Sequence, residues 1–201
     1  MAAYGQMRDR DVRAALRAKL ATDYAHDPNT KIVEEMGVWS GSVRIDLAVI
    51  NGELIGYELK SDRDTLERLP LQAQLYSRVF DRLTLVVGTR HARRAANMLP
   101  EWWGIRIAEW TEGGIIALHE ERPAQSNPAP DPYLVAQLLW KTEALAVLED
   151  YDLAKGWRSK TVRAIHQRLA MALDFSVLSA EVRKILKLRD SWLKQTTGGA
   201  I

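Results

Sequence analysis

The chain has 201 residues, 47% of them hydrophobic and 27% charged, so its composition predicts an ordered protein with a buried core. It contains no cysteine, which excludes a disulfide framework, a thiolate zinc site and a cysteine nucleophile. No apolar run approaches the roughly 18 residues needed to cross a bilayer, and the N-terminus lacks the apolar segment of a signal peptide, so we expect a cytoplasmic protein without a membrane partner.

The first part of the chain predicts one helix followed by three strands. Val12, Leu16 and Leu20 recur at helical spacing and predict an amphipathic helix over about residues 9–24. Three β-rich runs follow, and Gly-Ser or Asn-Gly pairs that favour turns separate them. These runs cover residues 31–39, 42–50 and 53–61.

Helices and strands then alternate. A helix is predicted within residues 64–80, with Pro70 at or near its first turn, because proline inside a helix costs about 3 kcal/mol. Beyond it we expect a buried strand, a helix, a strand and an edge strand, over residues 82–88, 90–100, 103–110 and 113–121. A helix between two successive strands implies a crossover, so the pattern predicts an α/β fold with a mixed central sheet.

A proline-rich stretch over residues 122–132 has the composition of a linker. We therefore expect a first domain over residues 1–121, a small helical C-terminal region over residues 133–195 and a frayed tail over residues 196–201. Three helices are predicted for the region, from the runs at 132–151, 159–173 and 179–193. These helices could bind DNA or a partner protein, and the partner could be a second copy of the chain. The alternative is that they pack against the first domain.

Charged residues interrupt the two apolar strands on either side of Asn51-Gly52. Asp46, Glu58 and Lys60 lie within these strands, and burying a charge costs several kcal/mol unless it is paired or coordinates a metal. Two carboxylates near one another are the oxygen ligands that Mg²⁺ prefers. A lysine beside them could hold a metal-bound water and stabilise charge on a phosphate.

The turn between these strands decides whether the two carboxylates can meet. A two-residue turn would place residues 46 and 57 opposite each other, and Asp46 and Glu58 would then point to opposite faces of the sheet. A connection of odd length, or a bulge, would place both on one face. We therefore predict a bulged, three-residue connection with Gly52 in the left-handed conformation.

Asp46, eleven intervening residues and then Glu58-Leu59-Lys60 resemble the signature of the PD-(D/E)XK nuclease superfamily. Ile45 stands where many members have proline. The resemblance implies a restriction-endonuclease-like αβββαβ core. It also implies a Mg²⁺ (or Mn²⁺) ion held by Asp46, Glu58 and the Leu59 carbonyl, with Lys60 assisting the attacking water. A further acid often completes such a site, and the candidates are Glu34 and Glu35, of which we favour Glu35.

A second motif extends the resemblance. Gln72 and Tyr76 lie four residues apart on the helix after the third strand, and resemble the Gln-x-x-x-Tyr motif of RecB-like members, which contacts DNA. About the first 110 residues are similar to small bacterial and prophage proteins with a predicted nuclease domain. The resemblance implies a metal-dependent deoxyribonuclease that hydrolyses phosphodiester bonds. The alternative is a non-catalytic DNA-binding or assembly protein that uses a nuclease fold in a phage or defence complex.

Basic residues gather in segments that contain no acid, although the formal net charge is only +2. Such segments can bind the phosphate backbone of DNA, or they can be ordinary solvated helix faces. The expected DNA contacts outside the Gln-Tyr motif are Arg44, Arg63, Arg90, Arg93, Arg94, Arg158 and Lys160.

Overall fold

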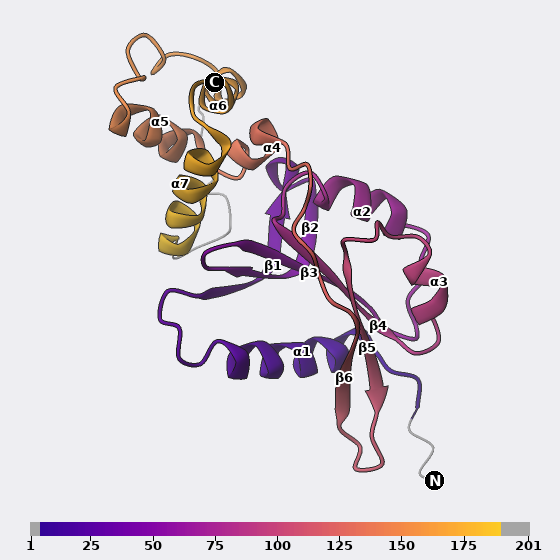
Figure 1. The fold of residues 1–201 in the computed structure, drawn as a ribbon. Helices are drawn as coiled ribbons and strands as arrows, with labels where there is room; N and C mark the ends of the chain where they lie inside the picture. The colour runs from indigo at the N-terminus through magenta and orange to yellow at the C-terminus, as the bar shows by residue number, and fades with distance from the viewer. Residues whose placement is uncertain (1–4, 190–201) are drawn as a thin grey trace, which may run out of the picture.

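The computed structural model describes residues 5–189, with the side chain of Ser40 left out. Its centre is one open sheet of six strands, which follow each other in chain order from edge to edge (Figure 1). The strands are β1 (Lys31–Val38), β2 (Val43–Ile50), β3 (Leu54–Lys60), β4 (Arg82–Gly88), β5 (Gly104–Trp110) and β6 (Ile116–Arg122).

The sheet is mixed, as the sequence predicts. The pairs β1–β2, β2–β3 and β5–β6 are antiparallel, whereas β3–β4 and β4–β5 are parallel. The two parallel steps need crossovers, and these contain helices α2 (Leu69–Tyr76) and α3 (Ala92–Ala96). The α/β class with a mixed central sheet is confirmed.

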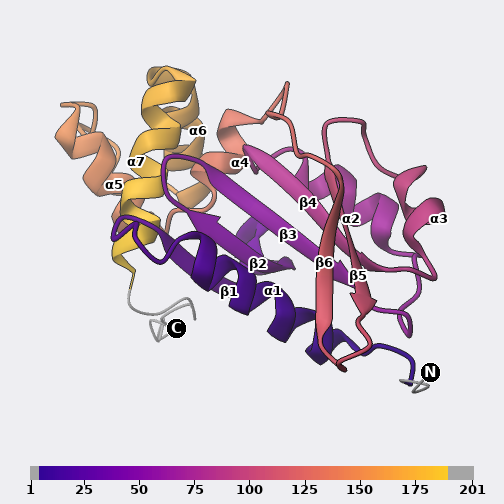
Figure 2. The same ribbon diagram turned by 60° about the horizontal axis from the view of Figure 1, so that its bottom comes forward.

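Helix α1 (Asp9–Asp23) covers one face of the sheet (Figure 2). Its predicted stripe is fully buried and packs in one apolar cluster with residues of β2 and β3, such as Leu47 and Tyr57. This cluster buries the apolar face that the spacing of Val12, Leu16 and Leu20 predicts.

The opposite face carries α2 and the C-terminal helices. These are α4 (Pro132–Ala136), α5 (Lys141–Asp150), α6 (Val162–Ala172) and α7 (Phe175–Leu188), and a 3-10 turn, η1 (Trp39–Gly41), links β1 to β2. A single apolar cluster joins Leu83 of the sheet to Leu169 and Leu186 of these helices. The helical region therefore shares its core with the sheet.

The prediction of one helix over residues 132–151 is wrong, because α4 ends at Ala136 and α5 begins at Lys141. Two side chains from later in the chain bind the backbone between them. Nη2 of Arg189 donates to the carbonyl oxygen of Leu138, and Nε2 of His166 lies 3.0 Å from that of Leu139. These tertiary contacts occupy carbonyl groups that a continuous helix would have used.

The proline-rich stretch is bound by hydrogen bonds to the segment that follows α2. Nδ2 of Asn127 donates to the carbonyl oxygens of Ser77 (2.7 Å) and Phe80 (2.8 Å), and the N–H of Asp131 donates to the carbonyl of Arg78. The division into domains at residues 122–132 stays a prediction. The end of the expected helical region and the expected tail, residues 190–201, lie outside the described residues. Within residues 5–189, no helix is long and apolar enough to span a membrane.

Candidate functional site

The β2–β3 connection has the predicted odd length. Ile50 pairs with Leu54, so three residues link the strands. The expected left-handed conformation of Gly52 is wrong, since Gly52 does not have a positive φ. The N–H of Glu53 instead donates to Oδ1 of Asn51 at 2.9 Å, and this side-chain turn closes the connection without a left-handed glycine.

The register places residue 46 opposite residue 58, but the paired ladder stops one step earlier, at Leu47 and Tyr57. Oδ2 of Asp46 accepts the backbone N–H of Leu59 at 2.7 Å. The side chain of Asp46 thus replaces a backbone partner where the two strands separate. On the other side of β2, Glu35 of β1 has φ 51°, a left-handed conformation that is rare for a residue with a side chain.

Glu58 and Lys60 form a buried ion pair at the end of β3. Glu58 is 2% exposed and Lys60 is 6% exposed, and Nζ of Lys60 lies 2.5 Å from Oε1 of Glu58. Nε2 of Gln72, on α2, donates to the same oxygen at 2.6 Å. Oε2 of Glu58 and Oε1 of Gln72 are buried without a hydrogen-bond partner among the described residues.

Burial perturbs both carboxyl groups. It raises the pKa of Glu58 to about 7; the charge of Asp46 adds to the rise, whereas Lys60 and Gln72 oppose it. Burial also raises the pKa of Asp46, against hydrogen bonds from Leu59 and Arg13 that favour the ionised form. A carboxylate in this cluster is therefore costly to keep ionised.

Arg13 of α1 completes the cluster, and the sequence analysis missed it. Its Nη2 lies 2.7 Å from Oδ1 of Asp46, and its Nη1 lies 3.0 Å from Oε1 of Glu35. Glu34 pairs instead with Arg17. The only local signal for Arg13 is its position beside the buried residue Val12 on the helix, which directs it toward the sheet margin.

The predicted metal ligands are thus bridged by cations. Arg13 joins Glu35 to Asp46, and Lys60 neutralises Glu58. Within the described part of the chain, no three Asp, Glu, His or Cys side chains form a group that could hold a metal ion. The expectation of a metal-binding centre made by these carboxylates is therefore wrong, while the use of Mg²⁺ or Mn²⁺ as a cofactor stays a prediction.

The Gln-Tyr motif faces inward. Gln72 binds Glu58, and the hydroxyl of the buried Tyr76 donates to the backbone carbonyl oxygen of Arg44. Burial raises the pKa of Tyr76 above its ordinary range, so the hydroxyl keeps its proton and remains a donor. Both side chains attach α2 to the start of β2 and the end of β3. Their predicted contact with DNA is untested.

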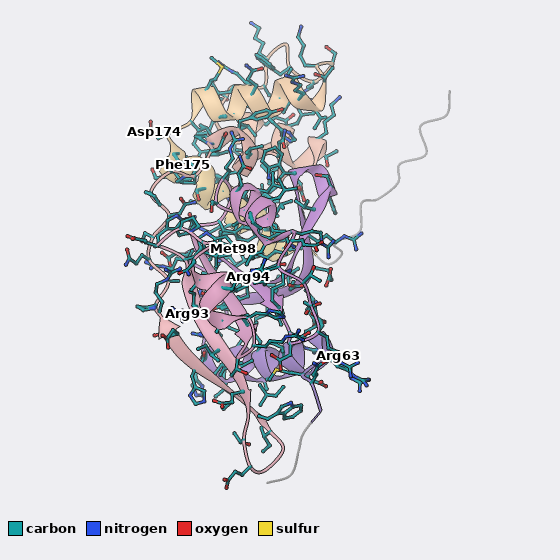
Figure 3. All side chains as sticks on the ribbon, turned by 90° about the vertical axis from the view of Figure 1, so that its right-hand side faces the viewer. Arg63, Arg93, Arg94, Met98, Asp174 and Phe175 are labelled. Carbon is teal, nitrogen blue, oxygen red and sulfur yellow. The ribbon has the colours of Figure 1, made fainter. Side chains whose placement is uncertain are left out.

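Several predicted DNA contacts lie at the edge of the sheet where β3 and β4 end. Arg63 follows β3, and Arg93 and Arg94 lie on α3, which follows β4; all three are exposed (Figure 3). Nη1 of Arg90 donates to the carbonyl oxygen of Asp62 at 3.3 Å and so links the two loops. Arg44 lies near the start of β2, which meets this edge because β2 is antiparallel to β3.

The remaining two predicted contacts lie in the C-terminal helical region. Arg158 and Lys160 belong to the exposed segment between α5 and α6. Nη2 of Arg158 lies 2.9 Å from Oε1 of Glu149, and both side chains are largely exposed, so this pair contributes little to stability. The structure therefore places the predicted contacts in two separate groups.

Comparison with known proteins gives a phage family. The model of the family described as bacteriophage P4 protein cII matches residues 4–198. Protein cII of Enterobacteria phage P4 is 44% identical to the chain over 55 residues, which are 27% of this chain and 21% of that protein. The aligned part thus spans about a fifth of the length of this relative. No solved structure matches the chain.

These matches correct the functional prediction. The matching family is that of a phage protein and not of a nuclease, and no comparison gives a nuclease or another hydrolase. The prediction of a Mg²⁺-dependent DNA nuclease is therefore wrong. The short nuclease-like signature is present here in a phage family with another name, and its residues Asp46, Glu58 and Lys60 form ion pairs.

Proposed function

Because the chain belongs to the bacteriophage P4 protein cII family, we propose that it is a phage regulatory protein that binds DNA without cutting it. DNA is the partner that its exposed basic residues fit best. Cytoplasmic location follows from this partner and is part of the proposal.

One observation carries the proposal. Arg63, Arg93 and Arg94 are exposed on the two segments that follow β3 and β4, with Arg63 and Arg93 on opposite sides of the view in Figure 3, and no carboxylate of the described residues lies within ion-pairing distance of them. Unpaired guanidinium groups are available to phosphate oxygens, which they bind through two parallel hydrogen bonds. Open α/β sheets commonly bind ligands at this edge, beyond the carboxyl ends of their parallel strands.

The ion-paired cluster supports a binding role over a catalytic one. It consists of the carboxylates of Glu35, Asp46 and Glu58 and the cations of Arg13 and Lys60. Its cations neutralise carboxylates that would otherwise repel the phosphate backbone near this edge. The same contacts tie α1 to β2 and join β3 to α2. We propose that the cluster fixes the edge in place, and that the first helix and five strands form a restriction-endonuclease-like core used for binding. The order β1 to β5, antiparallel and then parallel, supports this topology.

The test is DNA binding by fluorescence anisotropy, measured over a series of salt concentrations. The variant Arg63→Ala/Arg93→Ala/Arg94→Ala is expected to bind at least about tenfold more weakly and to reduce the slope of log affinity against log salt by about 3. The matched control, Arg17→Ala/Lys19→Ala/Lys184→Ala, removes three exposed cations that already have acid partners, and should bind like the wild type.

A second measurement separates binding from cleavage. Linear and circular DNA incubated with the protein and Mg²⁺ should remain intact on a gel while the anisotropy reports binding. Equal binding by the two triple variants would contradict the assignment of the edge. An absence of DNA binding by the wild type would contradict the proposed function itself.

A further inference from the structure

Helix α6 lies at the far end of the molecule from α3 (Figures 1 and 2), and one side of it is exposed to solvent. Arg163, Gln167 and Met171 follow each other at four-residue spacing and are all exposed, Met171 at 77%. The opposite side of the helix is buried through Ile165 and Leu169. This stripe of three residues is therefore a surface that the fold leaves uncovered.

The region around the stripe is strongly basic. Residues 153–173 contain five Lys or Arg residues and no Asp or Glu. Lys160 and Arg163 are exposed, and neither has an ion-pair partner among the described residues. Oγ1 of Thr161 accepts the N–H of Ala164 at 3.3 Å, which caps the helix and fixes where the stripe begins.

The helix that carries the stripe is held firmly. His166 is 4% exposed and binds the carbonyl of Leu139, and the guanidinium of Arg168 lies 5.7 Å from the ring centroid of Trp157. These contacts occupy the flanks of α6 and leave the stripe free. A rigid helix loses little conformational freedom when it binds.

We infer that the stripe of α6, together with Lys160, is a second DNA-contact surface that lies along the major groove of a duplex. This inference rests on the proposed function. An α-helix with its side chains is about 10–12 Å across, and the major groove is about 12 Å wide. Arginine and glutamine are side chains that pair with guanine and adenine edges there, and an apolar side chain such as Met171 can contact a thymine methyl group.

The two DNA surfaces lie at opposite ends of the molecule, whose sheet and C-terminal helices share one apolar cluster. Both views of the ribbon place α3 at one end and α6 at the other, and the sheet lies between them (Figures 1 and 2). A single short duplex that occupies the α3 edge therefore leaves α6 free for another. The protein bridges two DNA segments, which is an arrangement suited to a regulator that acts on two sites at once.

The test measures bridging by the full chain. One duplex is immobilised on beads, protein is added, and capture of a second, labelled duplex is recorded; native mass spectrometry then counts chains and duplexes in the complex. The stripe variant is Lys160→Ala/Arg163→Ala/Gln167→Ala. The matched control, Lys141→Ala/Lys184→Ala, removes two exposed cations from neighbouring helices outside the stripe.

The wild type and the control should capture the second duplex, and native mass spectrometry should find one chain with two duplexes. The stripe variant should capture about tenfold less while its binding to the first duplex changes less than about twofold. Equal capture by the stripe variant and the control would overturn the inference, as would complexes that contain only two chains with two duplexes. A wild type that binds one duplex but never two would overturn the bridging inference and leave the proposed function standing.

Discussion

The buried pair of Glu58 and Lys60 gives a quantitative prediction. The pKa of Glu58 is raised from its ordinary value of 4.5 to about 7, so holding this carboxylate ionised in the fold costs about 3 kcal/mol at alkaline pH. Lys60 already offsets part of the cost of burial. Removing Lys60 leaves the buried Glu58 charge uncompensated, a loss of about 3–5 kcal/mol, whereas removing both charges of a buried pair is often neutral.

The perturbation is therefore a cycle of three variants, Lys60→Met, Glu58→Gln and the double variant. Lys60→Met should lose about 3 kcal/mol of unfolding free energy at about pH 8, because it leaves an ionised, buried carboxylate without its cation. Glu58→Gln, which mimics the protonated carboxyl group, should be at least as stable as the wild type at this pH. The double variant should be more stable than Lys60→Met. Urea unfolding, followed by circular dichroism, measures all four proteins.

The sign of the pH dependence gives a second readout in the same experiment. Because the folded pKa of Glu58 lies above the unfolded value, its contribution to stability is fully present below about pH 4.5 and is lost as the pH rises through about 7. Glu58→Gln should remove this loss. Effects of the two single variants that simply add in the double variant would refute the reasoning, since they would mean that the side chains do not share a buried charge pair.

Two further predictions concern packing and titration elsewhere. A Cβ at Gly56 would lie 2.4 Å from Cδ1 of Ile45 and 2.7 Å from Cδ2 of Leu83. Gly56→Ala should therefore lower the free energy of unfolding by about 1–3 kcal/mol, measured by urea unfolding. An unchanged urea midpoint would contradict this packing. Burial lowers the pKa of His166 below 6.5, so stability is full above this pH and falls as the pH drops below it. Between about pH 8 and about pH 5, the free energy of unfolding should fall less for His166→Gln than for the wild type. An equal fall in the two proteins would contradict a lowered pKa of His166.

Local patterns predicted the elements that local interactions determine. The helical spacing of Val12, Leu16 and Leu20 located α1, and the β-rich runs with turn-forming pairs between them located the first three strands to within a few residues. The odd length of the β2–β3 connection followed from requiring Asp46 and Glu58 to share a face. The detail of that turn could not be predicted, because the side chain of Asn51 closes it in place of a left-handed glycine.

Long-range contacts decided what the sequence could not reveal. Arg13 lies 33 residues before Asp46, and no spacing rule indicates that these two side chains meet. The break between α4 and α5 depends on Arg189 and His166, which are distant in the chain. The functional prediction was wrong for a related reason, since a pattern of acids and a lysine gives residue types but not their charge partners.

The core that the sheet shares with the C-terminal helices has a mechanical consequence. Asn127 and Asp131 fasten the proline-rich stretch to the end of α2, so this stretch cannot act as a loose hinge. The distance and the angle between two DNA segments bound at the two ends of the molecule would then be set by the fold. Inserting or deleting residues in 122–132 would damage the protein itself before it altered that spacing.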